Sequence, residues 1–334
     1  MKIAIINTTR RKYGGAAYER MLAEVLSNNF EVEFINIGVR SKGRLKYLEA
    51  PLVLQRLFQI SKREDFDIII RNLEASFLFL NKKPTKNIAL IHHIDYSQQP
   101  FILRVILRLL EKMALKNLRK FDAIIVVSTY WENFFKQRNC TNVYKIYNSF
   151  NIKEFSFNQK EIDDFKKKNN LSERPVIYIG NAQKKKGVVE SHNALKDLNA
   201  YLVTSGKPQV EIPAVNLELD RRDYLRLLKA SSVVVTMSKF KEGWCRTAHE
   251  AMLSRTPVVG SGCGGMGELL EEGGQIICQD FEKLRDKVNF ALNHSELGEA
   301  GYKFAQNFTV EDFKRNWLNF LHSLKILLCM FLCL

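Results

Sequence analysis

Short runs of Val, Ile and other apolar residues alternate along the chain with segments of helical periodicity. In the first half the expected strands are Lys2–Thr8, Glu31–Ile37, Phe66–Arg71, Asn87–His92, Ala123–Ser128 and Val143–Tyr147. In the second half they are Val176–Gly180, Ala200–Thr204, Val210–Ile212, Ser232–Met237, Pro257–Gly260 and Gln275–Cys278. Apolar strands separated by helices are typical of parallel sheets covered on both faces. The pattern predicts an α/β protein of two Rossmann-like, doubly wound domains facing across a cleft.

The length of 334 residues also favours two domains, since single hydrophobic cores rarely grow past about 250–300 residues. Apolar strands give way to a polar, Lys-rich stretch between Asn148 and Glu173. We therefore expect one domain over residues 1–150 and a second over 151–309. In open α/β sheets, ligands bind beyond the carboxyl ends of the strands, so functional residues are sought just after them.

The loop after the strand Ser232–Met237 contains the strongest chemical signal. It carries Glu242 and leads into a helix expected to begin near Trp244 or Cys245, with Glu250 about two turns inside. The free N–H groups and positive dipole of a helix N-terminus suit a pyrophosphate. One carboxylate on each flank could hold sugar hydroxyls, a geometry that suits a nucleotide sugar. The alternative is a pair of solvated Glu side chains on an amphipathic helix.

A resemblance to a known family extends from this loop over nearly thirty residues. Glu242-x7-Glu250, followed by Pro257-Val258-Val259-Gly260 and Gly264-Gly265-x-x-Glu268-Leu269, resembles the signature of retaining glycosyltransferases of group 1, also called family 4, with the GT-B fold. The segment from Gly180 to Gly187 is similar to the family's Gly-Arg-x-x-x-x-Lys-Gly phosphate loop. The resemblance implies that residues 310–334 form a terminal helix crossing back toward the first domain, plus an apolar tail.

The resemblance also implies roles for residues of the second domain. Glu250 would bind the ribose hydroxyls, and Glu242, a candidate catalytic residue, would bind the donor hexose. The remaining implied donor-binding residues of this domain are Asn181, Lys185, Lys186, Gly243, Trp244, Cys245, Arg246 and Thr247. Asn181 stands where the family has a diphosphate-binding Arg, and Asn lacks the permanent charge and bidentate grip of Arg. Lys184 or Lys185 could substitute.

In the first domain, the same resemblance points to the ends of the first and fourth strands. Gly14 and Gly15 follow the first strand, where the family binds the donor phosphates and the acceptor. His92 and His93 follow the fourth, where relatives keep a His at the reacting sugar. Transfer would occur on one face of the sugar, with the leaving phosphate helping to deprotonate the acceptor. The His would position and stabilise, and we expect His92 rather than His93 because it directly ends the strand.

Together these residues predict a metal-independent, retaining hexosyltransferase. It would move a hexose from a nucleotide diphosphate sugar to a glycan or lipid-linked acceptor and would need no cofactor. Within the same fold, a nucleotide-sugar epimerase or a non-catalytic sugar-nucleotide binder stays open. A further alternative is an NAD-dependent oxidoreductase, because Gly262-x-Gly264-x-x-Gly267 matches a dinucleotide fingerprint. The helical stretch that follows it, Glu268–Glu272, argues against this because it is too short to cross back over a sheet.

The net charge of +15 is unevenly distributed. The first 150 residues hold 25 Lys and Arg against 13 Asp and Glu, which suggests that one domain faces something anionic. An expected helix over Gln99–Lys120 aligns Arg104, Arg108, Lys112 and Lys116 beside a wide apolar face, as in helices at membrane surfaces. A buried helix with one solvated edge is the alternative.

The basic segments lack interleaved aromatic residues and match no nucleic-acid-binding motif, so nucleic acid is not an expected partner. Six widely spaced Cys residues show no disulfide or zinc pattern. The first strand is too short an apolar run for a signal peptide. We expect a cytoplasmic protein, with a peripheral position on the inner face of the membrane left open. The sequence does not decide whether the apolar tail packs on the protein or enters a membrane.

Overall fold

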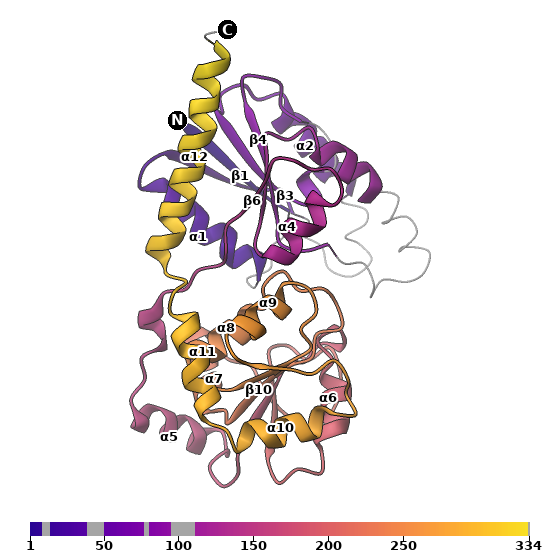
Figure 1. Cartoon of the computed structure of the whole chain (residues 1–334), viewed down its shortest axis with the longest axis vertical. Coiled ribbons are helices and arrows are strands. Elements are labelled where there is room, and N and C mark those ends of the chain that lie inside the picture. The colour runs from indigo at the N-terminus through magenta and orange to yellow at the C-terminus, as the bar shows by residue number, and fades with distance from the viewer. Residues whose placement is uncertain (9–13, 39–49, 77–79, 95–110, 333–334) are drawn as a thin grey trace. The chain divides into compact units, whose positions relative to one another are not determined.

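The computed structural model describes residues 1–8, 14–38, 50–76, 80–94 and 111–332, which form two compact units (Figure 1). Unit 1 combines residues 1–149 with the chain from Val310 onward, and unit 2 comprises Phe150–Thr309. The first division lies between Ser149 and Phe150, one residue before the expected position.

Unit 1 is built on a parallel sheet in the order β2-β1-β3-β4-β5-β6. Its strands are β1 (Lys2–Asn7), β2 (Glu31–Asn36), β3 (Ile68–Asn72), β4 (Lys86–Ile91), β5 (Ala123–Val126) and β6 (Val143–Lys145). Its helices include α1 (Gly15–Ser27), α2 (Ala50–Ser61), α4 (Thr129–Lys136) and α12 (Val310–Leu332), and residues 111–118 are also helical. Strands β3 and β5 are buried throughout, which explains the apolar sequence of β5 and of the first three residues of β3.

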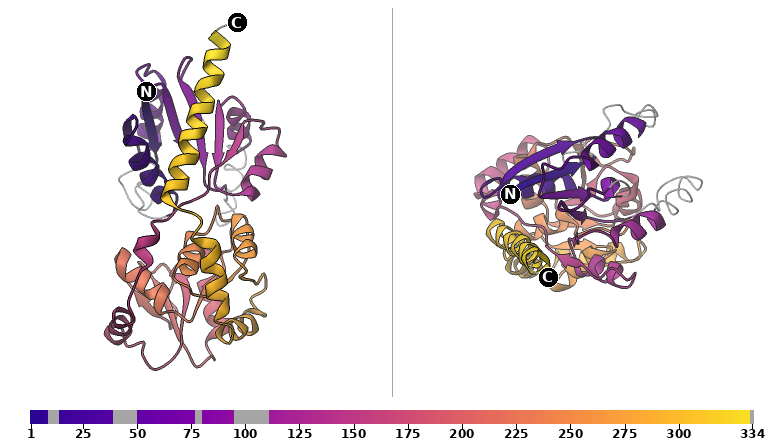
Figure 2. Two further views of the ribbon diagram at one scale, coloured as in Figure 1. Left: turned by 60° about the vertical axis from the view of Figure 1, so that its left-hand side comes forward. Right: turned by 90° about the horizontal axis from the view of Figure 1, so that it is seen from above.

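The terminal helix α12 completes the core of unit 1 and contacts α1, which is labelled next to it in Figure 1; Figure 2 shows α12 in yellow from two further sides. Trp317 is fully buried, and its indole Nε1 donates a hydrogen bond of 3.2 Å to the hydroxyl of Tyr18. Tyr18 in turn donates to the backbone oxygen of Ile146 at 3.1 Å. Among the described residues, no helix is both long and apolar enough to cross a membrane.

Unit 2 has a second parallel sheet, in the order β12-β11-β10-β7-β8-β9. Its strands are β7 (Val176–Asn181), β8 (Tyr201–Ser205), β9 (Val215–Leu217), β10 (Val233–Thr236), β11 (Val258–Gly260) and β12 (Ile276–Ile277). Its α-helices are α5 (Gln159–Lys168), α6 (Val188–Leu195), α7 (Arg221–Ala230), α8 (Arg246–Leu253), α9 (Gly265–Glu272), α10 (Leu284–Leu292) and α11 (Glu296–Ala305). The expected pair of doubly wound parallel sheets is confirmed.

Two details of unit 2 differ from the sequence prediction. Val210–Ile212 is not a strand; residues 206–214 connect β8 to β9 without a helix, and β9 begins at Val215. Prolines at 208 and 213 flank the mispredicted segment and cannot donate to a strand ladder, while Ile212 packs against the core instead. The second difference is α9, which links the parallel neighbours β11 and β12 although its segment looked too short to do so.

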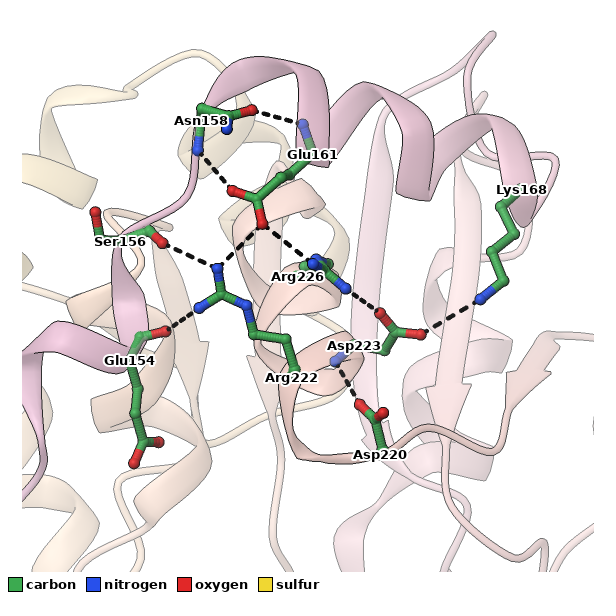
Figure 3. Close-up of polar contacts among 9 residues, drawn as sticks. All are labelled: Glu154, Ser156, Asn158, Glu161, Lys168, Asp220, Arg222, Asp223 and Arg226. Atoms are coloured by element: carbon green, nitrogen blue, oxygen red, sulfur yellow. Dashed lines mark hydrogen bonds and ion pairs between the residues drawn. The ribbon is translucent and has the colours of Figure 1, made fainter.

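The polar stretch in which we expected the domain boundary contains α5. Ion pairs connect α5 to α7 (Figure 3). Glu161 Oε1 accepts from both Arg222 and Arg226 of α7 at 3.1 Å. Asn158 and Glu161 form a capping box at the start of α5, and Asp220 caps the start of α7. These contacts fix the first turn of α7, which carries Arg221.

Candidate active site

The α8 helix begins at Arg246, slightly later than expected, and Glu250 lies about one turn inside it rather than two. Cys245 precedes the helix in a left-handed conformation, with φ 60° and ψ 72°. Its thiol is buried, and burial together with the charge of Glu242 raises its pKa to about 12. The thiol is therefore neutral and acts as a small packed side chain at the helix N-terminus.

The backbone of Glu242 is bonded to the loop after β11. Its N–H donates to Cys263 O at 3.1 Å, and its carbonyl accepts from the N–H of Gly265 at 2.9 Å. Gly264 between them has φ +72°, and a Cβ there would lie 2.5 Å from the carbonyl oxygen of Glu242. Only glycine fits this position, so the Gly264-Gly265 pair of the sequence signature fixes where Glu242 stands.

The side chain of Glu242 is buried and has two partners on one oxygen. Oε1 lies 2.6 Å from Lys186 Nζ and 2.5 Å from Ser238 Oγ. Lys186 ends the short turn η4 (Lys184–Lys186) after β7, and β7 is the sheet neighbour of β10, which precedes Glu242. Burial lowers the pKa of Lys186, but the charge of Glu242 more than offsets this and the pKa is raised. Lys186 is thus a fixed cation at the end of the sheet.

Glu250 forms the other side of the site and is paired with arginines. It is buried, and its Oε1 accepts from Arg221 Nη1 at 2.8 Å and lies 3.5 Å from Arg246 Nη2. Arg221 also donates to Glu154 from Nε and Nη2, at 3.3 and 3.2 Å. The guanidinium of Arg246 lies 4.3 Å from the ring centroid of Phe150. Two guanidinium groups therefore converge on the carboxylate expected to bind ribose.

Asn181, at the end of β7, belongs to a network of neutral groups. Its Oδ1 lies 3.4 Å from the hydroxyl of Tyr178, which is 2.7 Å from Ser205 Oγ. The ring of Tyr178 meets the edge of Tyr224, whose hydroxyl donates to Thr247 Oγ1 at 3.2 Å. Burial raises the pKa of both phenols above the usual value, so they remain protonated. This network connects Asn181 to the first turn of α8.

The remaining residues expected in the second domain lie on the same loops. Gly243 and Trp244 are buried, and the indole Nε1 of Trp244 donates to His249 Nδ1 at 3.0 Å. Lys185 Nζ lies 5.3 Å from the centroid of the Phe240 ring. Unit 2 therefore carries, on the loops that follow β7 and β10 and at the start of α8, the residues that the sequence predicts to bind the donor.

In unit 1, the expected residues meet at the carboxyl ends of β1 and β4. Gly14 has φ 61° and caps α1, and Gly15 begins that helix. A Cβ on Gly15 would lie 2.5 Å from Cδ2 of His92, so glycine is required for the His92 ring to occupy its place. His92 is partly buried, whereas His93 is exposed. The structure thus places His92 against the glycine turn.

Of the four residues expected to face a membrane, two lie among the described residues. Arg104 and Arg108 lie outside the described residues. Lys112 and Lys116 are exposed on the helical segment 111–118, where Ala114 and Leu118 are buried. Met113 on the same segment is 56% exposed.

Residues 159–308 match the model of the family described as "Glycosyl transferases group 1". Unit 2 is therefore similar to this family over nearly all of its length. The match covers nearly all of unit 2 and includes Lys186, Glu242 and Glu250.

Curated relatives match over part of their length. The chain is 27% identical to spore coat protein SA of Bacillus subtilis (strain 168) over 168 residues, which are 41% of this chain and 44% of that protein. It is 26% identical to the uncharacterized glycosyltransferase MJ1178 of Methanocaldococcus jannaschii over 210 residues, 57% of this chain and 56% of that one. The chain thus aligns with about half the length of these two proteins.

Solved structures match over nearly the whole chain. Anabaena Alr3699/HepE in complex with UDP-glucose gives a TM-score of 0.76 at 18% identity, covering 97% of this chain and 100% of that one. Sucrose-phosphate synthase from Thermosynechococcus elongatus gives 0.75 at 17%, covering 97% and 99%. The glycosyltransferase WaaG, involved in lipopolysaccharide biosynthesis, gives 0.70 at 15%, covering 94% and 97%. These similarities establish the GT-B fold.

Two features of unit 2 were missed in the sequence analysis. Arg221 contacts Glu250 from a different helix, so no local motif contains both. A weak signal was present, because Arg221 and Arg222 directly follow the capping Asp220, at a helix N-terminus where cations are disfavoured. Ser238 was also missed, although it lies at the end of the strand that precedes Glu242.

Proposed function

We propose that the protein transfers a hexose from a nucleotide diphosphate sugar to a glycan or lipid-linked acceptor. The observation that carries this proposal is the pair of buried carboxylates, Glu242 and Glu250, on either side of the first turn of α8, with the cation Lys186 beside Glu242. A diphosphate fits the helix N-terminus and the cation, and hydroxyl-rich groups fit the carboxylates. The HepE structures, which contain UDP or UDP-glucose, support a donor of this class.

The residues present suggest how the donor would be held. Lys186 would neutralise the negative charge that grows on the diphosphate as the glycosidic bond breaks, which is why we propose transfer without a metal ion. Glu250 would exchange its contact with Arg221 for the ribose hydroxyls, and Arg221 would keep its bonds to Glu154. Glu242 would accept hydrogen bonds from the hexose while Lys186 and Ser238 hold its Oε1.

For the chemical step we propose retention of configuration. The bond from the anomeric carbon to the phosphate oxygen breaks, and the bond to the acceptor oxygen forms on the same face. The proton of the acceptor hydroxyl passes to the departing phosphate oxygen. In this scheme His92 positions the reacting sugar and is not a nucleophile, in keeping with its place at the carboxyl end of β4.

We further propose that unit 1 contacts an anionic membrane. Helix α2 exposes Leu52, Leu54 and Phe58, at 49%, 45% and 43%, and Lys62 Nζ lies 4.2 Å from the centroid of the Phe58 ring. Exposed apolar side chains beside basic ones are typical of surfaces that enter the interface of a bilayer. Binding to vesicles of phosphatidylglycerol at low salt, reduced by Leu54→Ser with Phe58→Ser, would support this. The exposed pair Lys82 and Lys83, changed to Ser, would serve as the control.

The function itself is tested by donor binding followed by turnover. UDP-, GDP-, ADP- and dTDP-sugars are titrated by calorimetry, and nucleotide release is then measured with and without candidate acceptors. We expect one nucleotide to bind, and Glu250→Gln to weaken it at least tenfold. Glu154→Gln is the matched control, because it removes another carboxylate partner of Arg221. Unchanged binding by Glu250→Gln would overturn the assignment of the site.

A non-catalytic sugar-nucleotide binder is the second candidate, favoured by the neutral network around Asn181. The release assay separates the two. A nucleotide that binds but is never released from its sugar, with any acceptor, supports the binder.

A further inference from the structure

A buried carboxylate in unit 1 has no role in the proposals above. Glu19 lies on α1, one turn after Gly15, and is 2% exposed. Its Oε1 is 3.7 Å from Nε2 of His92, which is too far for a hydrogen bond. Oε2 of Glu19 and Nε2 of His92 are both buried and have no hydrogen-bond partner among the described residues.

Folding alone does not explain a carboxylate at this position. The other buried residues of α1 are Ala16, Tyr18, Leu22, Val25 and Leu26, so position 19 belongs to the apolar face of the helix. A buried polar group without a hydrogen bond costs about 1–3 kcal/mol, and an ionised one more. A leucine at position 19 would avoid that cost. The carboxylate is therefore better explained by a ligand than by stability.

The described groups around the pair form no hydrogen bond with Oε2 of Glu19 or with Nε2 of His92. The Tyr18 hydroxyl already donates to Ile146 and accepts from Trp317. The edge of the Tyr18 ring packs on the imidazole, with 5.2 Å between centroids, and this contact fixes the ring of His92. Gly15 has no side chain that could intrude on the imidazole.

We infer that Glu19 and His92 together bind one hydroxyl group of a carbohydrate. The hydroxyl would donate to Oε2 of Glu19 and accept from Nε2–H of His92, so that a single O–H group satisfies both buried atoms. The carboxylate and the imidazole are also close enough to share one oxygen, since Oε1 of Glu19 lies 3.7 Å from Nε2 of His92. Glu19 is thus a positioning residue at the carboxyl end of β1 and β4. This inference rests on the proposed glycosyl transfer, and the hydroxyl could belong to the acceptor or to the donor hexose.

The first test does not depend on turnover. The nitrogen resonances of His92 are followed by NMR while free glucose, galactose, mannose or glycerol is added, and the His92→Gln variant gives the assignment. We expect at least one of these hydroxyl compounds to shift the His92 signals in the wild type but not in Glu19→Gln. If all four leave them unchanged in the wild type, the inference is overturned. A shift in a protein that never transfers sugar would count against the proposed function alone.

The second test uses kinetics and stability together. Glu19→Gln should raise the KM of either the acceptor or the donor at least fivefold, and the one that changes identifies the source of the hydroxyl. Glu19→Leu should lower kcat/KM further while raising the unfolding midpoint, whereas a purely structural Glu19 would lower that midpoint. Glu24→Gln, on the exposed side of the same helix, is the control. Wild-type kinetics in both Glu19 variants would overturn the inference.

Discussion

Lys186 and Glu242, fifty-six positions apart in the chain, are joined by an ion pair of 2.6 Å between Nζ and Oε1. The pair connects the turn after β7 to the loop after β10, and Ser238 adds a second bond to the same oxygen. The cation proposed to bind phosphate and the carboxylate proposed to bind the hexose are therefore electrostatically coupled, because the charge of Glu242 raises the pKa of Lys186.

This coupling predicts the effect of Glu242→Gln. Without the carboxylate, burial outweighs the smaller opposing effect of Cys245, and the pKa of Lys186 falls below its ordinary value instead of lying above it. Activity of the variant should be low at neutral pH and should decline further at an alkaline pH where the wild type is still active. The pH profile of nucleotide release tests this. Ser238→Ala, which removes only the hydroxyl partner, should keep the wild-type profile, and an unaltered profile in Glu242→Gln would contradict the coupling.

We predict that Arg246 contributes more than Asn181 to binding a diphosphate, although Asn181 stands where the family pattern has the diphosphate-binding Arg. The side chain of Asn181 is neutral and bonded to Tyr178, whereas Arg246 places a guanidinium at the first residue of α8. Asn181→Ala should change the Kd of a nucleoside diphosphate less than about threefold. Arg246→Met should raise it at least about tenfold, or 1.4 kcal/mol. Calorimetry with the diphosphate and with the unphosphorylated nucleoside measures both, and a larger loss in Asn181→Ala would contradict this assignment.

His249 predicts how stability depends on pH. Burial lowers its pKa from 6.5 to about 3, Trp244 donates to its Nδ1, and its Nε2 donates to Ala305 O. Between about pH 3 and pH 6.5, the His249 side chain is protonated in the unfolded chain and neutral in the folded chain. This side chain therefore makes stability fall as the pH drops below 6.5, by up to about 1.4 kcal/mol per unit.

Urea unfolding at several pH values between 4.5 and 7.5 tests this dependence. His249→Gln should be less stable at pH 7 but should show a flatter dependence, smaller by about one proton. His294→Gln, which changes a partly exposed His, should keep the wild-type slope. An equal slope in all three proteins would show that His249 is not the source.

The backbone conformation of Arg255 predicts that glycine is more stable than alanine at the end of α8. It has φ +59°, and the bonds Thr256 N to Ala251 O and Arg255 N to Met252 O form a Schellman motif. Glycine adopts this conformation without the strain of about 1 kcal/mol that other residues pay. Arg255→Gly should be more stable than Arg255→Ala by about 1 kcal/mol in urea unfolding. Both variants lose the same contacts to Glu299 and Tyr302, so their difference isolates the backbone.

The sequence could predict most of the fold because strands buried in parallel sheets consist mostly of consecutive apolar residues. It could also predict that Lys186 and Glu242 lie close together, since each follows a strand and such residues gather at one edge of a sheet. The contact of Arg221 with Glu250 could not be predicted from strand ends, because it depends on the ion pairs that hold α7 against α5. Glu19 was missed because it stands where helical periodicity expects an apolar residue.

The connection from β8 to β9 shows a different limit. The run Val210–Ile212 has strand-like composition, but composition does not say which of two nearby apolar segments pairs with β8. The flanking prolines decide against the first segment, and Val215–Leu217 pairs instead. Its placement leaves a pocket of about 460 Å³ that is lined by Ala182, Thr204 and Asn216 among others.

The return of the chain to unit 1 sets an order for folding during synthesis. The two ends of unit 2 are bonded to each other. Phe150 N donates to Phe308 O at 3.0 Å, and Phe150 forms an isolated β-bridge with Thr309. Once Thr309 has left the ribosome, unit 2 has every residue it needs. Unit 1, although synthesised first, still lacks Trp317, the donor to Tyr18. Part of the core of unit 1 therefore stays uncovered until α12 has emerged from the ribosome.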